Sequence, residues 1–157
     1  SERDALEAEG VASILVLPIW SESTWSGFLS FEETRRQREW SAQDIRDLLA
    51  SPHVFALGDA RCFAMGRVVA GEAELLTLAC DPAHQGQGLG RACLGDFEAE
   101  AMARGAEEFF LEVAEDNTAA QNLYLSAGYT EAARRKAYYP RRGAAAVDAL
   151  ILRKPAG

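Results

Sequence analysis

The segment His84–Leu94, HQGQGLGRACL, places Gly86, Gly88 and Gly90 directly before a helical pattern. Glycine adds backbone freedom that folding must remove, so this density indicates a backbone that approaches something closely. A strand, a glycine-rich turn and a helix together form an anion site. The first N–H groups of a helix have no intrahelical acceptor, and the helix dipole adds partial positive charge. The segment therefore predicts a phosphate-binding loop, with Arg91 as an additional cation in the first helical turn.

Two common phosphate-binding loops do not match this segment. The Walker loop requires Gly-Lys-Ser/Thr, and the segment contains no lysine. The dinucleotide fingerprint GxGxxG fails because Arg91 or Cys93, depending on the register, stands where a third small residue is needed. The pattern that remains is Gln85-x-x-Gly88-x-Gly90.

A single carboxylate interrupts a later apolar strand, AEEFFLEVA. The alternation of a strand puts Phe109, Leu111 and Val113 on one face and Glu112 on the other. Because an unpaired buried charge is costly, Glu112 is expected to have a partner or a chemical task. A general base is one interpretation, and a structural ion pair with an arginine such as Arg67 is the other.

Composition narrows the classes of function. A length of 157 residues suits one domain, and 48% apolar and 25% charged residues are typical of a globular protein. The net charge of −8 argues against a nucleic-acid partner and favours basic ligands such as amines, or serves solubility alone. Three cysteines without metal spacing or a disulfide framework predict a reducing, cytoplasmic location and no metal. The residues before Val11–Trp20 are too acidic for a secretion signal, and no apolar run is long enough to span a membrane.

Hydrophobic periodicity and turn residues predict the order of the elements. Strands are expected at 53–58, 61–70, 72–81, 106–114, from 129 onward and at 146–154, helices at 89–103 and 117–128, and a loop at 140–145. Asn117 is the expected N-cap of its helix, and Ser41 begins a capping-box pattern for an earlier one. The first forty residues are ambiguous, and Ile14–Ile19 fits either a strand or a buried helical turn. The order predicts an α/β (α+β) fold in which helices flank a mixed, largely antiparallel sheet.

The loop and further blocks of sequence resemble the GNAT superfamily of N-acetyltransferases. The blocks are LACDP before the loop, LEV followed by Asn117, Leu123-Tyr124 followed by Gly128-Tyr129, and RRKAYY followed by VDALIL. The resemblance runs from about Trp40 to Arg153, and it implies a single GNAT domain over residues 1–157. Residues 1–40 match poorly, because this superfamily normally opens with a strand and a helix.

The resemblance implies a cofactor, acetyl-CoA, and assigns residues to it. In this superfamily the two middle strands of the sheet splay apart, and the arm of coenzyme A pairs with the exposed strand backbone while the loop holds the pyrophosphate. The implied cofactor-binding residues are Leu78, Ala79, Cys80, Gln85, Gly86, Gln87, Gly88, Leu89, Gly90, Arg91 and Asn117. The resemblance also assigns Glu112 as general base and Tyr124 as the acid that protonates the departing thiolate, although Tyr124 also fits a core aromatic beside Leu123.

Within the superfamily, the sequence resembles bacterial enzymes that acetylate the N-terminal amine of a small-subunit ribosomal protein. This resemblance implies a protein N-terminus as the acceptor and neither nucleic acid nor a membrane as a partner. The candidate substrate residues are Glu72, Arg134, Tyr138 and Tyr139, with Glu74 and Arg135 in the same two stretches, and solvated strand faces are the alternative for all of them. An α-amine with a pKa near 8 is roughly a tenth neutral at pH 7, which suits a single carboxylate base.

Two other functions remain open from the sequence. One is acetyl transfer to a lysine or a small-molecule amine, because no residue fixes the acceptor pocket. The other is a non-catalytic module that binds coenzyme A or a partner protein, against which the presence of both Glu112 and Tyr124 argues.

Overall fold

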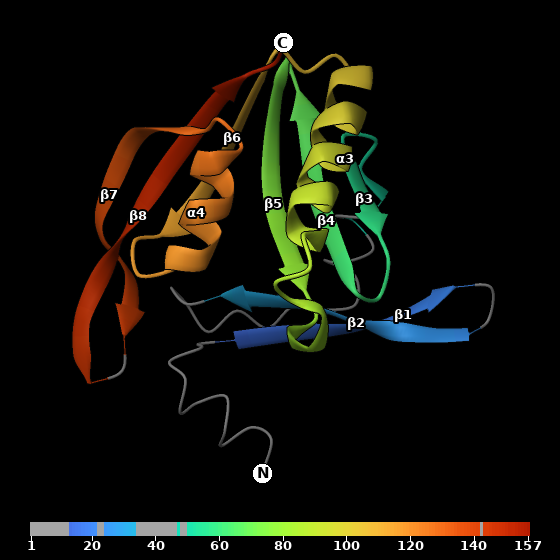
Figure 1. The fold of residues 1–157 in the computed structure, drawn as a ribbon, viewed down its shortest axis with the longest axis horizontal. Coiled ribbons are helices and arrows are strands. Elements are labelled where there is room, and N and C mark those ends of the chain that lie inside the picture. Colours follow the sequence, from blue (N-terminus) through green and yellow to red (C-terminus); the bar gives the residue numbers. More distant parts are fainter. Residues whose placement is uncertain (1–12, 22–23, 34–46, 48–49, 142) are drawn as a thin grey trace.

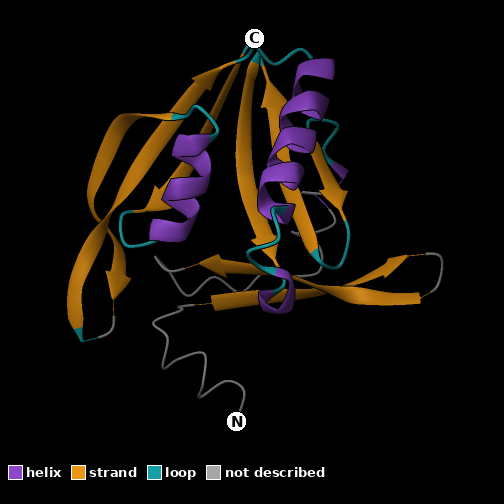
Figure 2. Cartoon of the chain, in the orientation of Figure 1, coloured by secondary structure: helices purple, strands orange, loops and turns teal. Residues whose placement is uncertain are grey.

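The computed structural model describes residues 13–21, 24–33, 47, 50–141 and 143–157. Six strands form one sheet in the order β3-β4-β5-β6-β8-β7, and helices α3 and α4 lie on the same face of it (Figures 1 and 2). The bounds are β3 Val54–Gly58, β4 Cys62–Val69, β5 Glu72–Cys80, η1 Pro82–His84, α3 Leu89–Ala103, β6 Glu108–Ala114, α4 Thr118–Ser126, β7 Thr130–Arg141 and β8 Ala144–Pro155. Only the β5–β6 pair is parallel in this sheet, so the predicted mixed, largely antiparallel sheet is confirmed.

Helix α3 packs an apolar stripe along the sheet. Cys93, Leu94, Phe97 and Ala101 are all buried. The ring of Phe97 stacks on that of Phe55 in β3 with centroids 5.5 Å apart. Burial of this stripe fixes the position of the N-terminus of α3, which follows the glycine-rich loop.

The two middle strands separate along β5. One residue of β5, Leu76, is skipped in the register with β4, which marks a β-bulge. The parallel pairing of β5 with β6 ends one residue earlier, at Leu75 and Leu111. A bulge increases the local twist of a strand, so β5 turns away from β6 beyond this point. Figure 1 shows the strands close together near the C-terminus of the chain and diverging toward the end of β5.

The N-terminal part differs from the strand-and-helix opening of the superfamily. Strands β1 (Ser13–Ser21) and β2 (Thr24–Glu33) pair antiparallel and form a separate two-stranded sheet. The ambiguous segment Ile14–Ile19 is therefore a strand. The capping box at Ser41 lies outside the described residues. None of the helices in the described part of the chain combines the length and the apolar character that crossing a bilayer requires.

The predicted loop at 140–145 is too long. Strand β7 continues to Arg141 and strand β8 begins at Ala144. Pro140 stays within β7 because β7 is the edge strand of the sheet, where a residue without an N–H can be accommodated. Arg141 therefore lies on a strand rather than in a loop.

The prediction that the cysteines form no disulfide is also wrong. Cys62 at the start of β4 and Cys80 at the end of β5 are bonded, and Cys93 is free and buried. The turn at Gly71 sets a register of β4 against β5 that would place Cys62 opposite Ala79. The bulge at Leu76 shifts this register by one residue, so that Cys62 pairs with Cys80. The pairing depends on that bulge, which spacing along the sequence does not reveal.

Candidate functional site

Two neighbouring cavities open where β5 and β6 separate. The first, here the loop cavity, has a volume of about 330 Å³ and is lined by Leu78, Cys80, His84, Gln85, Gly86, Gly88, Leu89, Gly90, Asn117, Ala119, Ala120, Leu123 and Tyr124. The second, here the strand cavity, measures about 340 Å³ and is lined by Leu75, Leu76, Thr77, Leu78, Leu111, Glu112, Val113, Ala114, Asn117, Ala120, Tyr124, Tyr139 and Arg141. Leu78, Asn117, Ala120 and Tyr124 line both, so the two cavities adjoin.

The loop cavity has the backbone of an anion site. Gly86 and Gly88 adopt φ values of +73° and +80°, which only glycine takes without strain. A Cβ atom at either position would meet no protein atom within 4 Å, so their far sides are open. Gly88 is the N-cap of α3 and provides no side-chain acceptor, which leaves the first N–H groups of the helix available to a ligand. The side-chain amide of Gln85 donates a hydrogen bond to the Cys80 carbonyl oxygen at 3.3 Å and so ties the loop to β5.

Not every residue predicted for the cofactor lies in the loop cavity. Ala79, Gln87 and Arg91 line neither cavity. The guanidinium of Arg91 donates to the Ser126 hydroxyl and so ties the start of α3 to the end of α4. Asn117 has the predicted capping role, since its side chain accepts from the Ala120 N–H at 3.2 Å.

Glu112 reaches the strand cavity from the face of the sheet opposite to the helices. Its neighbours Leu111 and Val113 are buried in the helical core, while 26% of its own side chain is exposed. One carboxylate oxygen accepts a hydrogen bond from the Tyr139 hydroxyl at 3.3 Å. The other oxygen lies 3.4 Å from the Arg135 guanidinium. The arginine partner suggested by the sequence, Arg67, pairs with Glu74 in this structure instead.

Tyr124 approaches the same space from the helical side. It is buried, and its ring packs edge-on against Tyr129 with centroids 5.9 Å apart. Burial raises the pKa of its phenol from 10.0 to about 12. Within the described part of the chain its hydroxyl has no hydrogen-bond partner, so it is a protonated group available to donate. The gap between β5 and β6 lets Tyr124 and Glu112 line one cavity although they approach from opposite faces of the sheet.

The four predicted substrate residues occupy different places. Tyr139 lines the strand cavity. Tyr138 packs beside it, with ring centroids 4.9 Å apart. Arg134 forms ion pairs with three carboxylates, those of Glu115, Glu131 and Asp148. Glu72 begins β5, at the end of that strand remote from Cys80, and lines neither cavity.

Two arginines lie at the site: Arg135, which was among the residues predicted near the acceptor entrance, and Arg141, which was not predicted. Arg135 contacts Glu112, and Arg141 lines the strand cavity. Arg141 donates to both Asp116 oxygens at 2.7 Å, and this pairing holds the pKa of Asp116 below its usual value. If the predicted strand had been extended past Pro140, the alternation of side chains along a strand would have put Arg141 on the same face as Tyr139. Among the described residues, no three histidine, cysteine or acidic side chains are grouped closely enough to hold a metal ion.

Comparisons with known proteins give one consistent result. A model of the acetyltransferase (GNAT) family matches residues 17–129. The chain is 43% identical over 98 residues to the [ribosomal protein bS18]-alanine N-acetyltransferase of Escherichia coli K12, which covers 62% of this chain and 66% of that protein. It is 36% identical over 127 residues to the N-alpha-acetyltransferase RimI of Mycobacterium tuberculosis, covering 75% and 77% of the two chains.

A solved structure shows the same likeness. The crystal structure of the ribosomal-protein-S18-alanine N-acetyltransferase from Escherichia coli matches with a TM-score of 0.65 and 36% identity over 75% of this chain and 78% of that one. The aligned part spans slightly less than two thirds of the length of the Escherichia coli sequence relative.

Proposed function

Because this chain belongs to the acetyltransferase (GNAT) family, we propose that it transfers the acetyl group of acetyl-CoA to the N-terminal amine of a protein. The acceptor is a ribosomal protein, as in the relatives whose names state that activity. The observation that carries the proposal is the meeting of Glu112 and Tyr124 in one cavity beside unpaired β5 backbone. A carboxylate and a protonated phenol on opposite sides of a strand edge suit the removal of a proton from an amine and its return to a leaving group.

The residues present fit acetyl-CoA, the acetyl donor that the family uses. Beyond Leu75, β5 has no β6 partner, so its backbone is free to pair with an extended ligand as an added strand does. Gly90 lies close under this edge, since a Cβ there would come within 3.5 Å of the Cys80 Sγ. The open sides of Gly86 and Gly88 and the free N–H groups of α3 suit a pyrophosphate.

Each residue then has one task. The thioester of acetyl-CoA supplies an activated acetyl group. The backbone of Leu78, Ala79 and Cys80 holds the arm of the cofactor, as the resemblance implies. Glu112 takes a proton from the acceptor amine, directly or through water, and Tyr124 donates its proton to the sulfur as the thiolate leaves. The high pKa of Tyr124 keeps that proton in place at neutral pH.

Its acidity makes an α-amine the better acceptor for this site. An α-amine has a pKa near 8, so roughly a tenth is neutral at pH 7, whereas less than a thousandth of a lysine amine is neutral. A single carboxylate such as Glu112 is therefore better matched to a protein N-terminus than to a lysine side chain.

The test is acetylation of matched peptides. One peptide carries a free N-terminal alanine and one internal lysine, and its control carries the same sequence with a blocked α-amine. We expect acetylation of the free peptide alone, located on the α-amine by fragmentation mass spectrometry. Acetylation of the lysine in both peptides would refute the choice of acceptor, and no transfer to any amine despite acetyl-CoA binding would refute enzymatic activity.

A further inference from the structure

Strand β7 contains a wide bulge opposite a single residue of β8. Arg135 pairs with Ala149 and Tyr139 with Val147, which leaves residues 136–138 of β7 facing Asp148 alone. Ala137, at the centre of this bulge, has a φ of +50°. A side chain other than glycine rarely adopts such a conformation, which persists only where the surroundings hold it.

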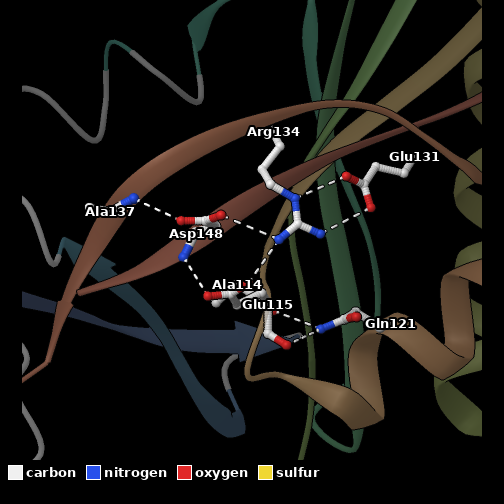
Figure 3. Close-up of polar contacts among 7 residues, drawn as sticks. All are labelled: Ala114, Glu115, Gln121, Glu131, Arg134, Ala137 and Asp148. Carbon is white, nitrogen blue, oxygen red and sulfur yellow. Dashed lines mark hydrogen bonds and ion pairs between the residues drawn. The ribbon is translucent and has the colours of Figure 1, made fainter. Parts of the chain in front are cut away.

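Asp148 supplies that hold. Its Oδ1 accepts the Ala137 N–H at 2.9 Å, and this bond, with help from nearby cations, keeps the pKa of Asp148 below its usual value. Its Oδ2 accepts from Arg134 at 3.3 Å, and its own N–H donates to Glu115 at 3.0 Å (Figure 3). Arg134 also donates to Glu115 at 2.9 Å, which closes the network. Asp148 therefore ties the bulge to the end of β6 through groups that are all paired.

The network also reaches α4. The Gln121 side chain donates to the carbonyl oxygens of Ala114 and Glu115 at 3.1 and 2.7 Å, as Figure 3 shows. Gln121 belongs to the helix that carries Tyr124. The bulge, the end of β6 and the helix of the proposed acid are thus held in one frame.

The bulge determines which side chains meet Glu112. Arg135 precedes it and Tyr139 follows it, and each contacts a different oxygen of the Glu112 carboxylate. In a regular strand, residues four apart lie roughly 13 Å apart, so their side chains would have to lean toward each other along the strand to reach one carboxylate. The extra residues shorten the distance along the strand, so that both side chains converge on the same group.

We propose that Asp148 is a positioning residue for the reaction: by holding the β7 bulge, it places Arg135 and Tyr139 on the two oxygens of Glu112. The carboxylate is then fixed in one orientation toward the acceptor amine. This inference rests on the proposed function, in which Glu112 is the base. It adds a residue on β8 that lines neither cavity and acts only through its neighbours.

A double-mutant cycle tests the proposal. We expect Asp148→Ala and Tyr139→Phe each to lower kcat roughly tenfold with acetyl-CoA affinity unchanged, because small misplacements of a reacting group cost that much or more. Because Asp148 acts through Tyr139 as well as through Arg135, the loss of kcat in the double variant should be much smaller than the product of the two single losses. Losses that multiply would overturn the proposal, as would wild-type kcat in Asp148→Ala.

A rescue variant separates positioning from general structural damage. Glycine adopts a positive φ without strain, so Ala137→Gly introduced into Asp148→Ala should recover most of kcat. No recovery in a folded double variant would contradict the proposal. If Asp148→Ala does not fold, Asp148→Leu takes its place in both experiments, since leucine keeps the bulk of the side chain but has no oxygen to accept from the Ala137 N–H.

Two controls complete the design. Glu131→Gln removes a partner of Arg134 on the side away from the bulge and should leave kcat within about twofold. Hydrogen exchange of the Ala137 amide should accelerate in Asp148→Ala whether or not the protein is an enzyme. A wild-type protein inactive on every amine would therefore refute the proposed function, whereas an active one with multiplicative losses would refute this inference alone.

Discussion

The two cavities are built in opposite ways. The loop cavity takes most of its lining from one continuous run, residues 78–90, and its main feature is backbone conformation. The strand cavity takes its lining from β5, β6, α4 and β7, and its main features are side chains held by hydrogen bonds and ion pairs. A local run of residues can encode an anion-binding loop, whereas an acid–base constellation requires the correct register of strands far apart in the chain. We therefore expect changes in one cavity to affect binding of the cofactor and changes in the other to affect turnover.

Glu112→Gln should have the largest effect. The amide keeps the shape of the carboxylate and can still accept from Tyr139, but it cannot take a proton. We expect kcat to fall roughly 10³-fold at neutral pH, within the range typical of a lost general base. Steady-state kinetics with the N-terminal alanine peptide measures this loss.

The binding of acetyl-CoA separates the two cavities in the same variant. Isothermal titration should give wild-type affinity, because Glu112 does not line the loop cavity. Weaker binding of the cofactor together with unchanged kcat would reverse the assignment of the cavities.

The sequence predicted the loop cavity far better than the strand cavity. The bounds of α3 and the N-cap Asn117 are as expected, because caps, glycines and apolar periodicity act within a few residues. The contact of Arg135 with Glu112 and the position of Arg141 at the strand cavity were not predicted, because they depend on a bulge in β7 and on the continuation of that strand past Pro140. These are outcomes of pairing with β8, and no short stretch of sequence contains them.

The same limit applies to the acceptor residues and to the cysteines. Arg134 was predicted to meet substrate, which stays a prediction, and its ion pairs with three carboxylates were not predicted. The Cys62–Cys80 bond follows from one extra residue in β5. For Arg134 and for the cysteines, the register of the strands decides which side chains become their partners.

Tyr124→Phe should have the next largest effect, because Tyr124 lines both cavities. We expect kcat to fall roughly 10²-fold, as for loss of a general acid, with little change in acetyl-CoA affinity because the ring remains. A large loss of cofactor affinity in a folded variant would indicate that the hydroxyl serves binding rather than proton transfer.

The pH dependence of the wild-type enzyme tests the same residue. Burial raises the pKa of Tyr124 to about 12, because it disfavours the phenolate. The stabilisation that the folded protein gains from the neutral phenol is therefore fully present below the ordinary pKa of 10.0 and is lost as the pH rises through about 12. We expect no fall in kcat from ionisation of Tyr124 below about pH 10, and a fall that Tyr124→Phe abolishes would contradict this assignment.

Gly88→Val should act on the loop cavity with a smaller effect. Gly88 has a φ of +80° and open space around it, so the cost of valine is backbone strain rather than a clash with the protein. Strain of about 1–2 kcal/mol distorts the free N–H groups and weakens acetyl-CoA binding roughly tenfold. The Kd is measured by titration, and kcat at saturating acetyl-CoA should stay close to wild type.

Gly95→Ala is the matched control for that variant. Gly95 lies within α3, has no positive φ and also has open space where its Cβ would stand. Alanine should stabilise the helix by about 0.5–1 kcal/mol and leave the Kd for acetyl-CoA unchanged. Equal losses of affinity in the two variants would show that bulk on α3, rather than the conformation of the loop, controls binding.

Reduction of the Cys62–Cys80 disulfide should have the smallest effect on catalysis. The bond joins residues 18 apart in sequence at the base of the loop cavity, and the β4–β5 hydrogen bonds hold the same register without it. We expect reduction, or Cys62→Ser, to lower the free energy of unfolding by about 2 kcal/mol, because the bond restricts the unfolded chain. The acetyl-CoA Kd should change by less than about threefold, since the loop conformation is set by its own glycines. Thermal unfolding and titration of one sample with and without reductant measure both. A tenfold loss of affinity on reduction would mean that the loop cavity depends on a covalent link to β4, outside the run of residues 78–90, and the contrast between a locally encoded cavity and an assembled one would then fail.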